Sequence, residues 1–156
     1  MGLLDFVKDA GARLTGREMA EERAEAEAFE ELRKGNTLMQ HVFGLGLTIE
    51  EMKITYDDGI ATIRGTCPSQ EEKEKIVLAV GNVAGVAQVD DQMVVEKPEP
   101  EAAMYTVVSG DTLSKIAKEH YGDASKYPVI FEANRPMLTD PNKIYVGQVL
   151  RIPPLS

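Results

Sequence analysis

The stretch of this sequence with the clearest chemistry is a six-residue segment that contains two glycines, Gly81-Asn82-Val83-Ala84-Gly85-Val86. It follows a helical run, residues 71–80, and precedes a strand-like run, residues 87–95. A helix that ends here leaves its last carbonyl groups without intrahelical partners, at the negative end of the helix dipole. The segment is therefore either a C-cap that connects helix to strand or a cage of main-chain oxygens for a weakly hydrated cation.

The composition of the chain limits the ligands and partners that such a segment can bind. The chain has 156 residues, of which 43% are hydrophobic, so one domain or two small ones can bury a core. Its net charge is −9, from 26 acidic and 17 basic residues. An acidic surface disfavours binding to nucleic acid or anionic lipid and favours small cations. We therefore expect no nucleic-acid or membrane partner.

The reactive residues do not predict an enzyme. Two histidines lie far apart in the sequence, and no nucleophile or metal-ligand motif accompanies them. The single cysteine, Cys67, stands next to Pro68 and is expected to be an ordinary turn residue. We read no secretory signal and no apolar run long enough to span a membrane. The expectation is a cytoplasmic monomer.

The first third of the chain is expected to be helical. Residues 1–15 predict an amphipathic helix that packs on the following domain, and residues 16–36, rich in Glu and Ala, predict a solvated helix or a partly ordered linker. We expect Gly35-Asn36 to break that helix. Asn36 or Thr37 would then cap a separate helix at residues 37–44.

Residues 37–96 predict an α-β-β-α-β unit. Two runs of alternating apolar and polar residues flank Asp57-Asp58-Gly59, a hairpin signal. Ser69 and Glu72 have the spacing of a capping box and predict a helix start. Asp91 shares the parity of the apolar residues in the last strand. It is expected either beside a positive group or at a bulge or exposed strand end.

The rest of the chain predicts a second unit. Residues 97–103 begin Lys-Pro-Glu-Pro-Glu and are expected to form an extended, solvated linker. Residues 104–153 predict a β-α-α-β order, with Asp111 capping the first helix and Ser125 the second. The predicted fold class is α+β.

Residues 104–153 closely resemble a LysM domain. The resemblance rests on Tyr105-Thr106-Val107, Ser109-Gly110-Asp111-Thr112-Leu113, Ile130-Phe131-Glu132-Ala133-Asn134 and the segment from Ile144 to Pro153. LysM domains elsewhere bind glycans that contain N-acetylglucosamine, in a groove between two loops. The resemblance implies a groove formed by Gly110, Asp111, Thr112, Leu113, Asn134 and Pro136.

Residues 37–96 resemble a BON domain, through Tyr56-Asp57-Asp58-Gly59, Thr62-Ile63-Arg64-Gly65, Gly81-Asn82-Val83 and Gly85-Val86. The two domains in this order, behind the opening sequence Met1–Gly11, are similar to the family of small cytoplasmic potassium-binding proteins. The resemblance implies reversible K⁺ binding by main-chain carbonyls of Val7, Ala10, Gly81, Val83 and Val86. Neutral carbonyls suit K⁺, whereas carboxylates would favour Ca²⁺ or Mg²⁺.

Two functions remain open from the sequence. In the first, the ion joins the N-terminal helix to the core and compacts the protein, which then acts as a K⁺ sensor or buffer. In the second, the LysM domain binds peptidoglycan fragments, for which the protein would have to be exported. The LysM domain could also bind a protein partner.

Overall fold

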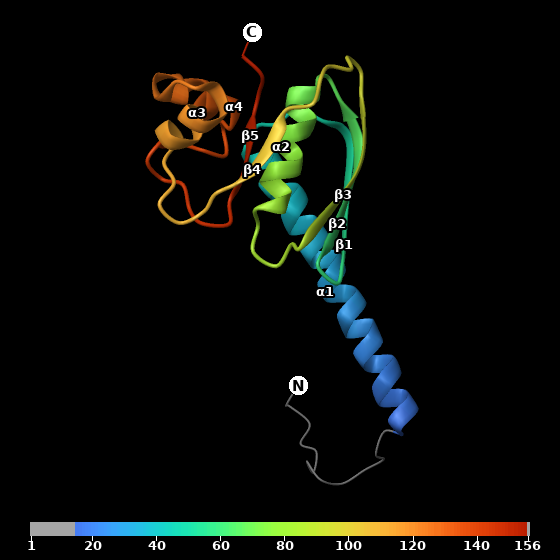
Figure 1. Cartoon of the computed structure of the whole chain (residues 1–156). Coiled ribbons are helices and arrows are strands. Elements are labelled where there is room, and N and C mark those ends of the chain that lie inside the picture. The colour runs from blue at the N-terminus through green and yellow to red at the C-terminus, as the bar shows by residue number, and fades with distance from the viewer. Residues whose placement is uncertain (1–14, 156) are drawn as a thin grey trace, which may run out of the picture. The chain divides into compact units, whose positions relative to one another are not determined.

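The structure is a computed structural model that describes residues 15–155, and it divides into two compact units, residues 1–30 and 31–156. The helix predicted for residues 1–15 lies outside the described residues, apart from Thr15. The fold is α+β, as predicted, with a helix and a three-stranded sheet followed by a small second domain (Figure 1).

Helix α1 spans Gly16–Gly44 and begins at a cap that the sequence interpretation missed. The Glu18 amide donates to Thr15 Oγ1 at 3.3 Å, and the Thr15 amide donates to Glu18 Oε2 at 2.6 Å. This reciprocal pair is a capping box. It lowers the pKa of the Glu18 carboxyl, because the carboxylate accepts the Thr15 backbone hydrogen bond.

The predicted break at Gly35-Asn36 is wrong, because α1 continues through both residues. A Cβ at Gly35 would lie 2.7 Å from the carbonyl oxygen of Ile54, so the helix backbone lies directly against strand β1. The Thr37 hydroxyl donates to Arg33 O at 2.9 Å, one turn earlier, instead of capping a new helix. Gly35 therefore allows the backbone of α1 to approach β1 closely, and it does not end the helix.

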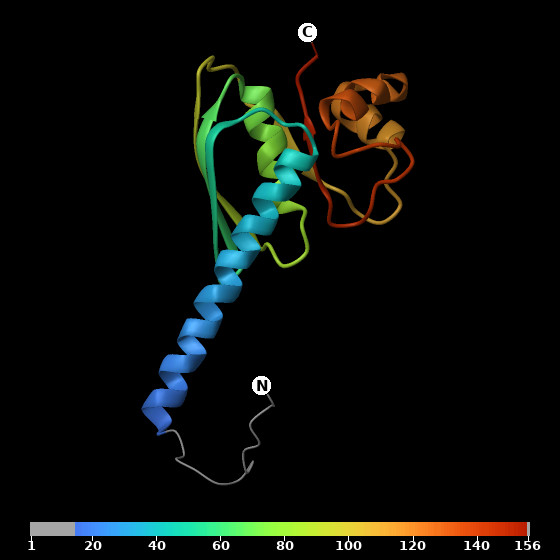
Figure 2. The same ribbon diagram turned by 180° about the vertical axis from the view of Figure 1, so that it is seen from behind.

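The sheet of the first domain has the order β1-β2-β3. Strands β1 (Glu50–Asp57) and β2 (Ile60–Cys67) form the predicted hairpin, with Asp58 and Gly59 at φ 44° and 85° in its two-residue turn. Helix α2 (Gln70–Gly81) then crosses over to β3 (Gln88–Val95), which runs parallel to β2. Figures 1 and 2 show α2 and the end of α1 on one face of this sheet.

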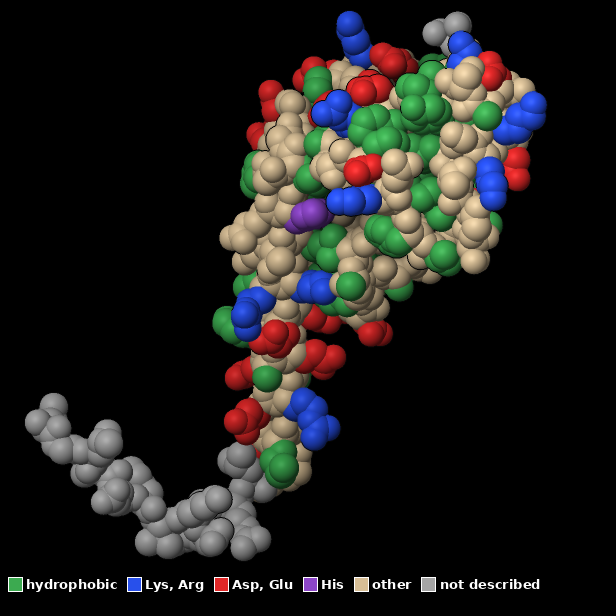
Figure 3. Space-filling model, turned by 90° about the vertical axis from the view of Figure 1, so that its left-hand side faces the viewer, with side chains coloured by type: hydrophobic (Ala, Val, Ile, Leu, Met, Phe, Trp, Pro, Cys, Tyr) green, Lys and Arg blue, Asp and Glu red, His purple; other side chains and the backbone are tan. Residues whose placement is uncertain are grey.

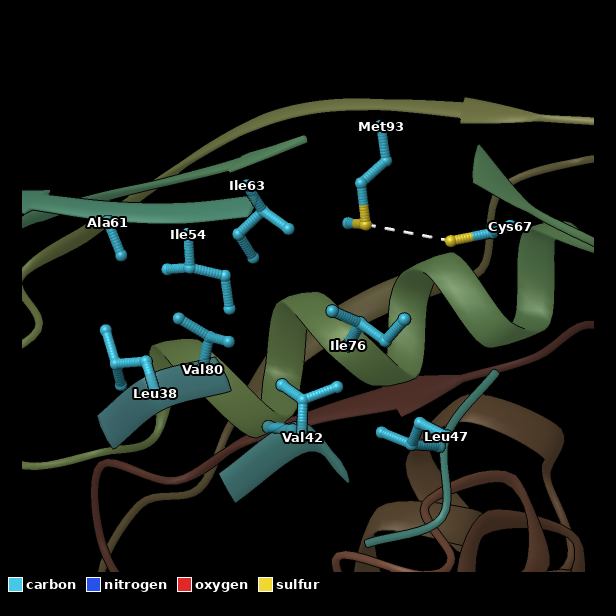
Figure 4. Packing of buried hydrophobic residues seen from close by; sticks show 11 residues of the cluster. Leu38, Val42, Leu47, Ile54, Ala61, Ile63, Cys67, Ile76, Val80 and Met93 are labelled. Carbon is cyan, nitrogen blue, oxygen red and sulfur yellow. Dashed lines mark hydrogen bonds between the residues drawn. The ribbon is translucent and has the colours of Figure 1, made fainter. Parts of the chain in front are cut away.

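The core of this domain fills the space between the two helices and the sheet (Figure 4). Leu38 and Val42 of α1 meet Ile76 and Val80 of α2, and all four are at most 1% exposed. The sheet contributes alternate residues of its inner face, as a half-buried sheet must. These are Ile54, Ala61, Ile63, Cys67 and Met93.

Two predictions about single residues are settled by this packing. Asp91 lies beside a positive group, Lys73 Nζ, at 3.1 Å, and the β2–β3 register runs without a shift, so the bulge alternative is wrong. Cys67 is not a turn residue; it ends β2, is fully buried and lies with its Sγ 3.7 Å from Met93 Sδ. Burial raises the pKa of its thiol to about 11.

The Ser69 cap of α2 is confirmed only in part. The Glu72 amide donates to Ser69 Oγ at 3.2 Å, as a capping box requires. The Glu72 carboxylate, however, accepts from the Thr48 amide at 2.9 Å. Glu72 thus ties α2 to the segment between α1 and β1.

The second domain has the predicted β-α-α-β order. Strand β4 (Ala103–Thr106) pairs antiparallel with β5 (Val149–Ile152), and α3 (Leu113–Tyr121), the 3-10 turn η1 (Ala124–Lys126) and α4 (Tyr127–Ala133) lie between them. Their buried residues form a second core around Ile116, Ile130 and Leu150. This core is separate from that of the first domain.

Both caps predicted for this domain are wrong by one or two residues. Thr112, not Asp111, caps α3, and its hydroxyl accepts from the Lys115 amide at 3.2 Å. Ser125 does not cap the second helix, because α4 begins after Lys126, whose side chain makes no capping hydrogen bond. The turn η1 before it is capped by Asp123, with Oδ1 accepting from the Ser125 amide at 2.9 Å. Before α3, the neighbouring residues Asp111 and Thr112 are both suitable caps, and the local sequence does not decide between them.

The two domains meet along α2 and β5, around a buried ion pair. Arg151 Nη2 of β5 lies 3.5 Å from Glu74 Oε2 of α2, and both side chains are less than a tenth exposed. The amide of Ala102, at the end of the predicted linker, donates to Glu74 Oε1 at 2.9 Å. The end of the linker is therefore fixed against α2.

The surface mixes charges of both signs. On the face drawn in Figure 3, Lys and Arg side chains alternate with Asp, Glu and hydrophobic side chains. Among the described residues, none of the helices has the length and hydropathy needed to cross a membrane.

Candidate cation site

The glycine loop, defined here as residues 81–86, closes the end of α2 with a series of tight turns. The Asn82 amide donates to Leu78 O at 3.0 Å, and the Val83 amide donates to Val80 O at 3.2 Å. The Val86 amide then donates to Val83 O at 3.1 Å. Gly85 has φ 92°, a conformation that residues with a Cβ rarely adopt. The carbonyls of Leu78, Val80 and Val83 accept these bonds, and the loop lies at the negative end of α2.

Two of these carbonyls bind side chains from α1 and β1. Lys34 Nζ donates to Ala84 O at 3.0 Å, and Tyr56 OH donates to Gly85 O at 2.8 Å. The same ammonium lies 5.6 Å from the centre of the Tyr56 ring, within the range of a cation–π contact. A monovalent cationic group therefore already lies on one oxygen of the loop, that of Ala84.

The side chain of Asn82 points to the second domain. Its Nδ2 donates to Val149 O and its Oδ1 accepts from the Val149 amide, both at 2.9 Å. A cavity of about 200 Å³ lies beside this contact and is lined by Gly81 and Ala87 among others. The candidate site is thus directly connected to strand β5.

The structure brings together three of the five carbonyl residues implied by the resemblance. Gly81 ends α2, and Val83 and Val86 face each other across a turn of the loop. Val7 and Ala10 lie outside the described residues. The sequence does not predict the contacts of Lys34 and Tyr56, because these residues stand 50 and 29 positions from their loop partners and no local pattern marks them.

The donor chemistry fits a monovalent cation. Among residues 15–155, no group of three or more His, Cys, Asp or Glu side chains is arranged to hold a metal ion. The loop offers neutral carbonyl oxygens, which replace the hydration shell of K⁺ in channel filters. One of these oxygens accepts from an ammonium group, a compact monovalent cation.

The residues implied for a glycan groove have mixed roles. Leu113 and Asn134 are buried, and the Asn134 side chain bonds Ile130 O and both main-chain groups of Arg151 at 2.7–2.9 Å. Asp111 Oδ2 accepts from Tyr105 OH at 2.6 Å and from the Val108 amide at 2.9 Å. Thr112 caps α3. Gly110 and Thr112 are exposed and Asp111 and Pro136 half-buried, so these four leave more surface for a ligand than Leu113 and Asn134.

The pair of hydrogen bonds to Asp111 also sets its charge state. Tyr105 OH and the Val108 amide both donate to the carboxylate, which lowers the pKa of Asp111. The same contact raises the pKa of Tyr105 to about 12. Asp111 is therefore an ionised structural acceptor that stabilises the loop before α3.

Comparison with known protein families identifies both domains. The BON domain model matches residues 42–97, and the LysM domain model matches residues 105–153. Both matches agree with the elements of the fold, since the first covers the three-stranded sheet with α2 and the second runs from within β4 to the end of β5.

Three relatives share parts or nearly all of this sequence. The potassium binding protein Kbp of Escherichia coli O6:H1 (strain CFT073) is 46% identical over 158 residues, which is 98% of this chain and 99% of that protein. The esterase Rv1288 of Mycobacterium tuberculosis is 55% identical over 53 residues, only 11% of its length. A protein of Deinococcus radiodurans is 36% identical over 102 residues, 40% of its length.

The similarity to the esterase is confined to about a third of this chain, whereas the similarity to Kbp extends over nearly all of both proteins. The order of the two domain matches agrees with the order of the two cores in the structure. This chain therefore belongs to the family of Kbp, with a BON domain followed by a LysM domain.

Proposed function

We propose that this protein binds potassium ions reversibly through main-chain carbonyl oxygens of the glycine loop. In this proposal Gly81, Val83 and Val86 supply oxygens from the loop, and Val7 and Ala10 supply oxygens from the N-terminal segment. The observation that carries the proposal is the contact between Lys34 Nζ and Ala84 O, in which the loop accepts a monovalent cationic group at 3.0 Å. The similarity to a protein named for potassium binding supports it.

Three physical properties of the site favour K⁺. Carbonyl oxygens are neutral, so they compensate a weakly hydrated ion without the high charge that attracts Ca²⁺ or Mg²⁺. The C-terminal end of α2 adds the negative end of its dipole. The net charge of −9 raises the local concentration of cations around the whole chain.

Ion binding would act on folding and compactness. An ion held by oxygens of both the N-terminal segment and the glycine loop joins two parts of the chain that are far apart in sequence. At a free ion concentration of about 100 times Kd, this linkage stabilises the bound form by about 2.7 kcal/mol. A cytoplasmic K⁺ sensor or buffer, and not an enzyme, is the role that follows from such a switch.

The test is a comparison of cations at equal ionic strength. We expect the thermal midpoint of the full chain to rise with KCl and to change much less with NaCl or choline chloride. In the same titration, carbonyl and amide resonances of residues 81–86 should shift, while those of α3 in the LysM domain stay in place. Equal responses to all three salts, or shifts spread evenly over both domains, would refute the proposal.

A second candidate function is glycan binding by the LysM domain, favoured by the match of residues 105–153 to that family. The exposed residues of the implied groove, Gly110 and Thr112, with the half-buried Pro136, are the surface that a peptidoglycan fragment would contact. Titration with N-acetylglucosamine oligomers should then shift resonances of these loops and leave the glycine loop unchanged. No shift at millimolar oligomer would remove this candidate.

A further inference from the structure

We propose that Lys34 is a tethered cation that competes with the free ion for the glycine loop and so sets the affinity of the site. The inference rests on the proposed function, because it concerns the same loop. It assigns a role to a side chain of α1 that lies outside the set of carbonyl ligands implied by the family.

The geometry places the Lys34 ammonium on the loop through neutral groups. Nζ donates to Ala84 O at 3.0 Å, lies 5.6 Å from the centre of the Tyr56 ring, and approaches Gly85 so closely that a Cβ there would lie 2.9 Å from it. A carbonyl oxygen, an aromatic face and a bare glycine Cα are also surroundings that suit a weakly hydrated monovalent ion. The ammonium thus resembles a ligand of the loop.

The charge on this ammonium opposes a second cation nearby. Ala84 lies between Val83 and Val86, two of the proposed ligands, so an ion held by those carbonyls and the ammonium would occupy neighbouring positions on the same loop. Two unit charges about 6 Å apart repel each other enough to lower affinity about threefold, even with the screening of bulk water. The ion must therefore displace Lys34 or bind against its repulsion.

Without the ion, the same contact keeps the loop ordered. Lys34 and Tyr56 hold adjacent carbonyls, those of Ala84 and Gly85, from two different elements. The loop is then preformed, and the site exchanges one cationic group for another without passing through an open state. Lys34 thereby shifts the response of the protein toward higher ion concentration.

A purely structural role for Lys34 gives the opposite prediction. If the ammonium only fastened the loop, its removal would loosen the ligands and weaken ion binding. Tyr56 provides the matched comparison, because Tyr56→Phe removes the hydrogen bond to Gly85 O without changing any charge. Lys143→Met controls for net charge, since Lys143 is exposed and lies in the LysM domain.

The experiment is a KCl titration of the full chain, in which K⁺ binding is measured by calorimetry and by the shift of the Gly85 amide resonance. It is carried out on wild type and on the variants K34M, K34R, Y56F and K143M. We expect K34M to bind K⁺ about threefold tighter or more than wild type. We expect K34R, which keeps the charge, and K143M to bind within a factor of two of wild type, and Y56F to bind no tighter than wild type.

The outcomes separate this inference from the proposed function. If wild type responds to KCl but K34M binds K⁺ equally or more weakly, the competition model is refuted and the proposed function stands. If K143M tightens binding as much as K34M, the effect belongs to net charge and the inference is also refuted. If wild type shows no response specific to KCl, the proposed function itself fails.

Discussion

Asn82 and Val149 form two reciprocal hydrogen bonds, in which the asparagine amide pairs with the main chain of strand β5 at 2.9 Å in both directions. An asparagine side chain carries one acceptor and a donor group, as a peptide unit does, so Asn82 takes the place of a neighbouring strand residue. The residue lies in the glycine loop, next to Gly81 and Val83. The contact therefore joins the candidate ion site to the LysM domain.

Removal of this side chain should separate the two domains in part. We expect Asn82→Ala to lower the free energy of unfolding by about 1–3 kcal/mol, because both main-chain groups of Val149 lose their partner. The KCl-dependent rise in thermal midpoint should also become smaller. Asn142→Ala, at an exposed asparagine of the LysM domain, is the control. Equal effects of the two variants in urea unfolding would contradict the role of Asn82.

The buried ion pair at the domain interface predicts a larger effect. Glu74→Gln removes the nearer carboxylate from the buried Arg151 guanidinium and leaves Glu71 Oε1, 3.8 Å from Nη1. We therefore expect a cost of about 3 kcal/mol, at the lower end of the range for a broken buried ion pair. The double variant Glu74→Gln with Arg151→Met should recover part of the loss, since it removes both charges. Glu132→Gln tests an exposed pair with Arg135 and should change stability by less than about 1 kcal/mol. Chemical denaturation of wild type and the three variants measures their free energies of unfolding and so ranks these effects.

Two glycines of α1 should respond in opposite directions to the same substitution. Gly35→Ala places a Cβ 2.7 Å from Ile54 O, so the helix must move away from β1 and the protein should be destabilised by more than about 1 kcal/mol. Gly44→Ala meets no atom within 4 Å and should be neutral or stabilising by up to about 1 kcal/mol. Thermal unfolding of the two variants is the measurement. A stable Gly35→Ala protein would show that the close approach is not required.

The Tyr105–Asp111 contact predicts a pH effect in the LysM domain. The pKa of Asp111 is lowered in the folded protein, so its contribution to stability is present above the ordinary aspartate pKa and is lost as pH falls through the lowered pKa. Tyr105→Phe removes the main cause, and the pKa of Asp111 should rise toward its ordinary value. Carboxyl NMR titration measures this shift.

The control for that titration is within the same domain. The pKa of Asp123 is lowered by hydrogen bonds from Ser125, not from Tyr105, so it should not change in the Tyr105→Phe variant. An unchanged pKa of Asp111 in that variant would show that the Val108 amide alone keeps the carboxyl ionised.

Local patterns in the sequence were sufficient for most of the elements. The alternation around Asp57-Asp58-Gly59 predicts the hairpin, and Ser69 with Glu72 predicts the start of α2, because turn and cap preferences act over four residues or fewer. The parallel pairing of β3 with β2 also agrees with a helix between two strands. These features need no information about tertiary contacts.

The errors arose where a tertiary contact overrides a local preference. Gly35 has the sequence signal of a helix end, yet it allows α1 to lie against Ile54 O. Cys67 stands next to Pro68 and so has the sequence signal of a turn, yet its side chain packs against Met93. Lys34 reaches the glycine loop across 50 residues, so only the folded chain reveals it. The candidate ligands of the loop itself could be proposed from the resemblance alone.

The burial of Cys67 has a practical consequence for following this protein in solution. It is the only thiol of the chain, it is inaccessible in the folded state, and its pKa of about 11 keeps it protonated near neutral pH. Maleimide dyes should therefore react with cysteines introduced on the surface and spare the native one. Two such dyes, one on each domain, would allow single-molecule fluorescence to record changes in the distance between the two domains. The buried cysteine would not have to be replaced for this measurement.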